Sequence, residues 1–158
     1  MKIPRASAVV SSVFGIGYFG QGQGTIMSAI TVPLAILLAV KGGGGIVVAG
    51  AAIIVLVVGI LSCSEYVRES GNPDPSECVI DELAGQLLAS SFVAFAPLSL
   101  PAFFLSFALF RLFDIWKPWP VYLAETKLHS GLAVMMDDIV AGLMAGVICF
   151  VVHYYHWL

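Results

Sequence analysis

The stretch MMDDIVAGLMAGVICFVV, residues 135–152, is apolar along most of its length but carries two adjacent aspartates near its start. An apolar run of this kind can cross a lipid bilayer as a helix, which needs about 20 residues. Asp137 and Asp138 are costly in such a run, because a carboxylate in an apolar environment loses its hydration unless something compensates. The stretch therefore predicts a membrane helix from Leu132 to Tyr155 that contains a polar site.

The composition of the whole chain agrees with a membrane protein. Of its 158 residues, 59% are hydrophobic and 11% are charged, and its mean hydropathy is +0.98. These values predict an all-α, polytopic bundle that forms a single membrane-embedded domain over residues 1–158. The net charge of −3 argues against nucleic acid as a partner. The N-terminal MKIPRASAVV lacks a convincing cleavage site, so we expect it to be retained.

Four further apolar runs precede the opening stretch, which gives about five membrane-embedded helices. The fourth run is ended by KPWP at residues 117–120, since proline cannot continue a helix. VYLAETKLHSG, residues 121–131, then reads as an amphipathic connector. The four runs are residues 25–40, 46–63, 79–96 and 102–116.

The basic residues indicate how such a bundle is oriented. With five alternating spans and the N-terminus inside, only Lys41 lies on the outer side. The other six lie on the inner side, in agreement with the positive-inside rule. The same arrangement gathers all ten acids at the inner, cytoplasmic face. The six inner cations are Lys2, Arg5, Arg68, Arg111, Lys117 and Lys127.

Acidic residues mark the inner ends of three different expected helices. Glycine follows two of these groups by one helical turn, as Gly85 after Asp81 and as Gly142 after Asp138. Gly142 and Gly146 also have the spacing of a close-packing face between membrane helices. We therefore expect the acids to converge where the helices pack closely. The acids are Asp81, Glu82, Asp114, Asp137 and Asp138.

Five converging carboxylates would repel one another unless cations are present. Arg111 and Lys117 supply only part of that charge. An all-oxygen ligand set suits a hard divalent cation, and Mg²⁺ is the usual one in phosphate chemistry. The alternative, in which each acid simply lies in the interfacial layer beside a basic side chain, accounts for one such group better than for three. The acids thus predict a Mg²⁺ site for a phosphate-bearing substrate.

Other residues could belong to this site. Lys117 could reach a phosphate or only extend to the interface, and His129 could shuttle a proton or lie on the connector surface. Glycines at 15, 17, 20, 22 and 24 are similar to a phosphate-binding loop, with Thr25 and Ser28 just beyond it. The three cysteines form no CxxC pair and no thiol-phosphatase motif, because Arg68 follows Cys63 after four residues instead of five. We expect them to be buried apolar fillers.

Four blocks of this sequence resemble the phosphatidylglycerophosphatase A family. They are GQGTIMS at 22–28, IDELAGQ at 80–86, FRLFDIWKPWP at 110–120 and DDIVAG at 137–142, in the family's order. The resemblance implies a Mg²⁺-dependent hydrolase of the bacterial inner membrane, with its active site toward the cytoplasm. Its substrate would be phosphatidylglycerophosphate, and its products phosphatidylglycerol and inorganic phosphate.

The resemblance also assigns roles to residues. It implies catalytic roles for Asp81, Glu82, Asp114, Lys117, Asp137 and Asp138, the five acids being the metal ligands. It also carries over Gly24, Thr25 and Ser28, and Thr25, Ser28 and Lys117 would contact the substrate. Arg111 and His129 are further candidate substrate contacts, which the resemblance does not supply. In the first block this chain departs from the family, since Gly20 and Gln23 replace two prolines and Met27 replaces a glycine.

The chemistry leaves some alternatives open. Direct attack by water is expected, and an aspartyl-phosphate remains possible although the DxDx[TV] pattern is absent. The rival function is a cation- or proton-coupled transporter that uses the same acids. A CDP-alcohol phosphotransferase is disfavoured because its signature is missing. The sequence leaves the oligomeric state open.

Overall fold

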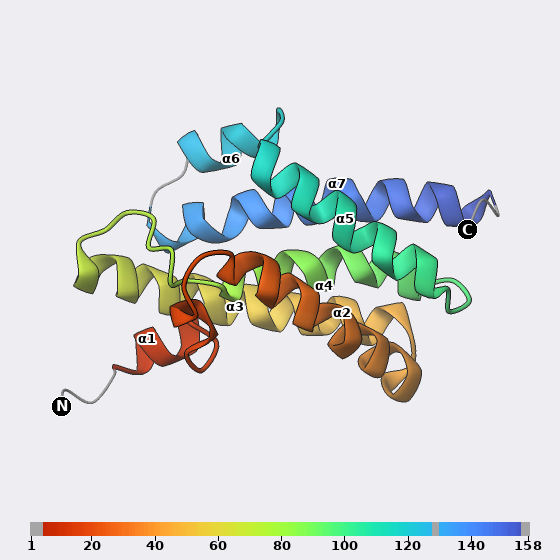
Figure 1. Ribbon diagram of the computed structural model, residues 1–158, viewed down its shortest axis with the longest axis horizontal. Coiled ribbons are helices and arrows are strands. Elements are labelled where there is room, and N and C mark those ends of the chain that lie inside the picture. The colour runs from red at the N-terminus through yellow and green to blue at the C-terminus, as the bar shows by residue number, and fades with distance from the viewer. Residues whose placement is uncertain (1–4, 128–129, 156–158) are drawn as a thin grey trace.

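The computed structural model describes residues 5–127 and 130–155, which form helices and contain no strand. The all-α expectation is therefore confirmed for the described part of the chain. The elements are α1 (Ala6–Ser11), the 3₁₀ helix η1 (Ile16–Tyr18), α2 (Gln23–Gly42), α3 (Gly45–Ser70), α4 (Ile80–Ala94), α5 (Leu100–Trp116), α6 (Val121–Lys127) and α7 (Gly131–Tyr154). The helices α2, α3, α4, α5 and α7 run broadly along the long axis of the molecule, and α1 and α6 lie toward one end (Figure 1).

Each apolar run became a helix, and glycine or proline sets several of the boundaries. Gly43 and Gly44 have positive φ angles of 111° and 81°, so the chain reverses between α2 and α3 within two residues. The α5 helix starts after Ser99, whose Oγ accepts a hydrogen bond from the Ala102 N–H at 3.4 Å. It ends at Trp116, with Lys117 as its C-cap just before Pro118.

Within the described residues, three helices are long and apolar enough to cross a membrane: α2, α3 and residues 131–153 of α7. The α4 and α5 helices have only 15 and 17 residues. At 1.5 Å per residue they are shorter than a hydrocarbon core of about 30 Å. The expected count of about five membrane-embedded helices is therefore not confirmed, because three of the five bundle helices are candidate spans. For α4 and α5, membrane insertion stays a prediction.

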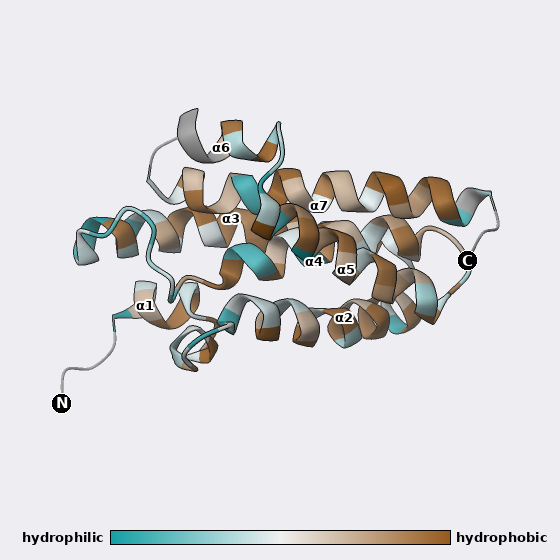
Figure 2. Ribbon diagram, turned by 45° about the horizontal axis from the view of Figure 1, so that its top comes forward, coloured by the Kyte–Doolittle hydropathy of each residue, from teal (hydrophilic) through white to brown (hydrophobic). Residues whose placement is uncertain are grey.

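The outer surface of the bundle is apolar. Ile53, Ile54 and Leu61 on α3 are each more than 60% exposed, and α2 and α7 carry similar exposed side chains. Figure 2 shows these helices mostly in the hydrophobic colour, with hydrophilic residues concentrated toward the end that carries α1 and α6. Such an extended apolar surface suits contact with lipid.

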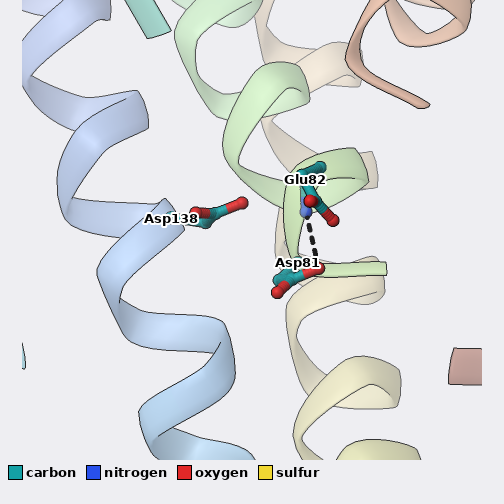
Figure 3. Close-up of side chains that lie close together, drawn as sticks. All are labelled: Asp81, Glu82 and Asp138. Carbon is teal, nitrogen blue, oxygen red and sulfur yellow. Dashed lines mark hydrogen bonds between the residues drawn. The ribbon is translucent and has the colours of Figure 1, made fainter. Parts of the chain in front are cut away.

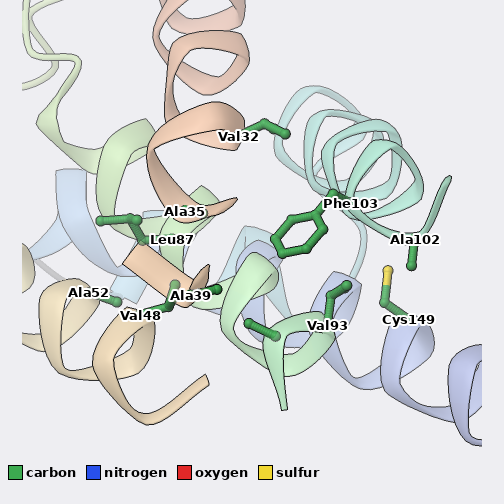
Figure 4. Close-up of a cluster of buried hydrophobic side chains, with 11 residues drawn as sticks. Val32, Ala35, Ala39, Val48, Ala52, Leu87, Val93, Ala102, Phe103 and Cys149 are labelled. Atoms are coloured by element: carbon green, nitrogen blue, oxygen red, sulfur yellow. The ribbon is translucent and has the colours of Figure 1, made fainter. Parts of the chain in front are cut away.

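The interior is made of small and medium side chains, which allow the helices to pack closely. One cluster joins α2, α3, α4, α5 and α7 around the fully buried Phe103 (Figure 4). Its other members are Val32, Ala35, Ala39, Val48, Ala52, Leu87, Val93, Ala94, Ala102 and Cys149. Cys63, Cys78 and Cys149 are all buried and free, as expected.

Candidate active site

Acids from three helices meet in one cavity of about 270 Å³, which we call the acid pocket. The acid pocket lies beside the N-terminal parts of α4 and α7 and the C-terminal end of α5. Its lining residues are Gly22, Gln23, Gly24, Asp74, Pro75, Ser76, Cys78, Asp81, Glu82, Arg111, Asp114, Lys117, Asp137 and Asp138.

Two glycines bring α4 and α7 together beside this pocket. A Cβ atom added at Gly85 would lie 2.6 Å from the Asp138 carbonyl oxygen, and one at Gly142 would overlap the Gly85 carbonyl. Gly146 continues this contact against Phe92. The expected close-packing face is therefore confirmed, and it holds the first turn of α4 next to Asp138.

Asp81, Glu82 and Asp138 form the tightest group of acids. Each offers an oxygen, and these three oxygens all lie within 4.8 Å of one another. In Figure 3 Asp138 points from α7 toward the two acids at the start of α4. Asp81 Oδ1 accepts a hydrogen bond from the Glu82 N–H at 3.0 Å. Glu82 Oε2 and Asp138 Oδ2 are buried without a hydrogen-bond partner.

The electrostatics of the two α4 acids follow from this placement. Burial raises the pKa of Asp81 well above its ordinary value, and the neighbouring charges of Glu82 and Asp138 raise it further. Burial also raises the pKa of Glu82, although its hydrogen bond with Asp81 opposes the shift. Both groups would thus be stabilised as carboxylates by a cation placed between them.

The C-terminal half of α5 and the Lys117 that caps it provide the cations of the pocket. Arg111 Nη1 donates to Asp114 Oδ2 one turn away, and both side chains are only 15% exposed. Arg111 Nε is buried and has no hydrogen-bond partner. Lys117 has a left-handed φ of 46°, and its Nζ donates to Asp137 Oδ2 at 3.0 Å. The break at Lys117–Pro118 thereby joins α5 to α7 across the pocket.

The glycine-rich stretch of residues 15–24, which we call the glycine segment, forms another wall of the acid pocket through Gly22, Gln23 and Gly24. Gly22, with a φ of 83°, precedes α2, whose first N–H groups lack partners within the helix. A Cβ at Gly24 would overlap Glu82 Oε1, so a larger residue here would displace the Glu82 carboxylate from its place in the pocket. Gln23 Nε2 donates to the Ser76 carbonyl at 2.7 Å, which links the segment to the loop before α4.

The structure brings most of the predicted site residues together: all five acids, Arg111 and Lys117 line the pocket. Thr25 is exposed and Ser28 is buried, its hydroxyl donating to the Gly24 carbonyl at 2.8 Å. Neither residue lines the pocket, and His129 lies outside the described residues. The catalytic and binding roles of all these side chains stay predictions.

Sequence reasoning missed part of the pocket wall. Asp74, Ser76 and Cys78 come from the loop between α3 and α4, and Gln23 is the first residue of α2. Among these residues, only Asp74 was indicated by the sequence, because it is an acid in the polar stretch just before Asp81. Nothing local in the sequence places this loop over the pocket.

The pocket can accommodate both a cation and an anion. Its lining holds six carboxylates and two basic side chains, which leaves a surplus of negative charge. The unpartnered Glu82 Oε2 and Asp138 Oδ2 are acceptors, whereas Arg111 Nε and the first N–H groups of α2 are donors. Carboxylate oxygens suit a hard divalent cation, and the donors suit phosphate oxygens.

Comparison with known proteins agrees with this chemistry. A family model described as phosphatidylglycerophosphatase A matches residues 9–153. A phosphatidylglycerophosphatase A of Escherichia coli (strain K12) is 28% identical over 99% of this chain and 88% of its own length. Another, from Haemophilus influenzae, is 31% identical over 88% of this chain and 79% of its own length. No solved structure matches the chain.

Proposed function

The chain belongs to the phosphatidylglycerophosphatase A family, and from that premise we propose that it removes the terminal phosphate of phosphatidylglycerophosphate in the presence of Mg²⁺. The products are phosphatidylglycerol and inorganic phosphate. The observation that carries the proposal is the acid pocket, which is lined by two buried carboxylate oxygens without partners, Glu82 Oε2 and Asp138 Oδ2, and by one buried donor without a partner, Arg111 Nε.

The donor set fits a divalent cation. Asp81, Glu82 and Asp138 offer three oxygens within 4.8 Å of one another, two of these side chains have a buried unpartnered oxygen, and all lie on rigid helices. These three residues would hold Mg²⁺, with Asp114 and Asp137 close by on the same pocket wall. When bound, Mg²⁺ supplies positive charge that offsets the phosphate and makes a nearby water molecule more acidic.

Basic and backbone donors of the chain bind the phosphate itself. Arg111 is held by Asp114 through Nη1 and still has its Nε available for a phosphate oxygen. Lys117 stands at the same wall, anchored to Asp137. The N-terminal amides of α2, at Gln23 and Gly24, add donors that favour an anion. These groups stabilise the charge that develops on the transferring phosphoryl group.

The reaction is a direct hydrolysis. A water oxygen attacks phosphorus, and the bond between phosphorus and the glycerol oxygen breaks. Asp114 accepts the proton of the attacking water and returns it to the departing alkoxide. Arg111, which is bonded to Asp114, keeps this carboxylate oriented during both transfers.

The site faces the cytoplasm in this proposal. The N-terminal α1, the loop before α4 and α6 lie toward the same end of the bundle (Figure 1). Of the basic residues expected on the inner side, Arg5, Arg68 and Lys127 belong to these segments or border them. Trp116 and Trp119 are 72% and 76% exposed at this end, where Trp rings favour the lipid interface. The acyl chains can stay in the bilayer while the headgroup enters the pocket.

A transporter remains without a supporting observation. Ion conduction would need charged or polar groups along a path through the bundle. The five acids proposed for the Mg²⁺ site all line the acid pocket, at one end of the bundle. The relatives are named as phosphatases.

Phosphate release tests the proposal. The purified protein in mixed micelles with phosphatidylglycerophosphate should release phosphate with Mg²⁺ and none after chelation with EDTA. Asp81→Asn and Asp138→Asn should each lose most of this activity. Glu65→Gln, which changes an exposed acid of α3 outside the acid pocket, is the matched control and should stay active. Full activity in both Asn variants would refute the proposed site.

A further inference from the structure

A second cavity, of about 520 Å³, adjoins the acid pocket. The two share Gly22, Gln23 and Ser76, so Gln23 and its hydrogen bond to the Ser76 carbonyl form the boundary between them. We call this second space the tyrosine cavity. Its lining residues are Gly17, Tyr18, Gly20, Gln21, Gly22, Gln23, Ser76 and Glu77.

The lining of the tyrosine cavity differs in charge from that of the acid pocket. Tyr18, Gln21 and Gln23 offer a phenol and two amides, which are neutral donors and acceptors. Its one charged lining residue is Glu77, and no Lys or Arg is among the lining residues that the structure describes. A phosphate would meet repulsion here, whereas hydroxyl groups could donate to the carboxylate and accept from the amides.

The walls of this cavity are fixed in place. Gly17 packs on the Glu77 carbonyl so closely that a Cβ atom would overlap it. Tyr18 Oη lies 3.3 Å from Tyr66 Oη on α3. The Gly17 contact and the Gln23–Ser76 hydrogen bond tie η1 and the start of α2 to the loop before α4, independently of the Tyr18–Tyr66 pair. The cavity is therefore a built feature of the fold between these elements.

We infer that the tyrosine cavity binds the neutral, hydroxyl-bearing glycerol to which the scissile phosphate is attached. This inference rests on the proposed function, because it places the terminal phosphate in the acid pocket. The glycerol then crosses the Gln23 boundary, and Tyr18 and Gln21 contact its oxygen atoms. The cavity is large enough for such a group, since small-molecule sites usually measure roughly 300–1,000 Å³. It would select substrates that carry this glycerol over simpler phosphate monoesters.

Steady-state kinetics on the full chain in mixed micelles tests the inference. The double variant Tyr18→Phe/Gln21→Ala should raise KM for phosphatidylglycerophosphate about tenfold, as for two lost neutral hydrogen bonds. Its kcat should change by less than about twofold. Inorganic phosphate, which needs only the acid pocket, should inhibit the variant and the wild type with the same inhibition constant.

Tyr66→Phe is the matched control. It removes the same Tyr18–Tyr66 hydrogen bond, but Tyr66 does not line the cavity. Its KM should stay within about twofold of the wild type. An unchanged KM in the double variant, an equal rise in Tyr66→Phe, or a parallel rise in the phosphate inhibition constant would each overturn the inference. A wild-type protein that released no phosphate would instead remove the proposed function.

Discussion

Replacing Gly85 by alanine tests whether the α4–α7 contact positions the acids. The added Cβ would lie 2.6 Å from both the Asp138 carbonyl oxygen and Phe110 Cε2. Ordinary contact begins at 3.4 Å, so the two helices must separate by about 0.8 Å or distort. The contact is to backbone on one side and to a fully buried ring on the other, and neither can move away cheaply.

Two effects follow from this displacement. Overpacking of a close interface costs about 1–3 kcal/mol of unfolding free energy. A shift of about 1 Å between catalytic groups costs on the order of 100-fold in rate. Asp81 and Glu82 lie in the turn before Gly85, so the shift separates them from Asp138. Gly85→Ala should therefore lose about 100-fold in phosphate release and require more Mg²⁺ for half-maximal activity.

Gly50→Ala is the matched control for this variant. Gly50 lies inside α3, and a Cβ there would meet nothing within 4 Å. Alanine should be tolerated there and should stabilise the helix slightly. The assays are phosphate release over a range of Mg²⁺ concentrations and thermal unfolding in detergent. A Gly85→Ala protein with the activity and Mg²⁺ requirement of Gly50→Ala would refute the reasoning.

Two further variants probe the charges of the pocket. Asp138→Asn keeps the side-chain size but removes a negative charge from the acid cluster, so without metal it should unfold at or above the wild-type temperature. Mg²⁺ at 100 times its Kd should stabilise the wild type by about 2.7 kcal/mol and this variant hardly at all; equal Mg²⁺ stabilisation of both proteins would contradict the assignment. Lys117→Met leaves the Asp137 carboxylate without its ion pair at 3.0 Å, and phosphate release should fall at least about tenfold. Lys41→Met, at the exposed far end of α2, should change activity by less than about twofold; equal losses in the two lysine variants would count against a role for Lys117.

Much of the fold followed from local sequence patterns. The apolar runs predicted all five bundle helices, and glycine or proline near their ends placed most boundaries within a few residues. The exception is α3, which continues to Ser70, seven residues beyond the predicted end at Cys63. Its last two turns carry charged residues that project past the apolar run, so hydropathy alone ends the helix too early.

The meeting of the acids could be predicted because alternating helices return to the same membrane face. The glycines one turn beyond Asp81 and Asp138 indicated close packing, and Gly85 and Gly142 do contact each other. The pocket wall formed by Asp74, Ser76 and Cys78 could not be predicted. These residues lie in an irregular loop, and its position depends on contacts with the glycine segment that leave no periodic pattern in the sequence.

The role of the glycine segment could also be predicted only in part. Its composition suggested a phosphate-binding loop, and Gly22 and Gly24 do line the acid pocket. Which side chains beyond it face the pocket depends on the exact start of α2. Because that helix begins at Gln23, Thr25 is exposed and Ser28 is turned into the bundle, where it bonds to the helix backbone. A shift of one residue in the helix start would rotate these side chains by about 100°.

The central claim is that acids from α4 and α7 share one divalent cation, and the most direct measurement is an anomalous difference map from crystals soaked in Mn²⁺. Mn²⁺ takes the same oxygen ligands as Mg²⁺ and can be located by its anomalous scattering. A peak within coordination distance of carboxylate oxygens from Asp81, Glu82 and Asp138 is the predicted result. A map with no peak among these three side chains, at a Mn²⁺ concentration that supports phosphate release, would contradict the claim.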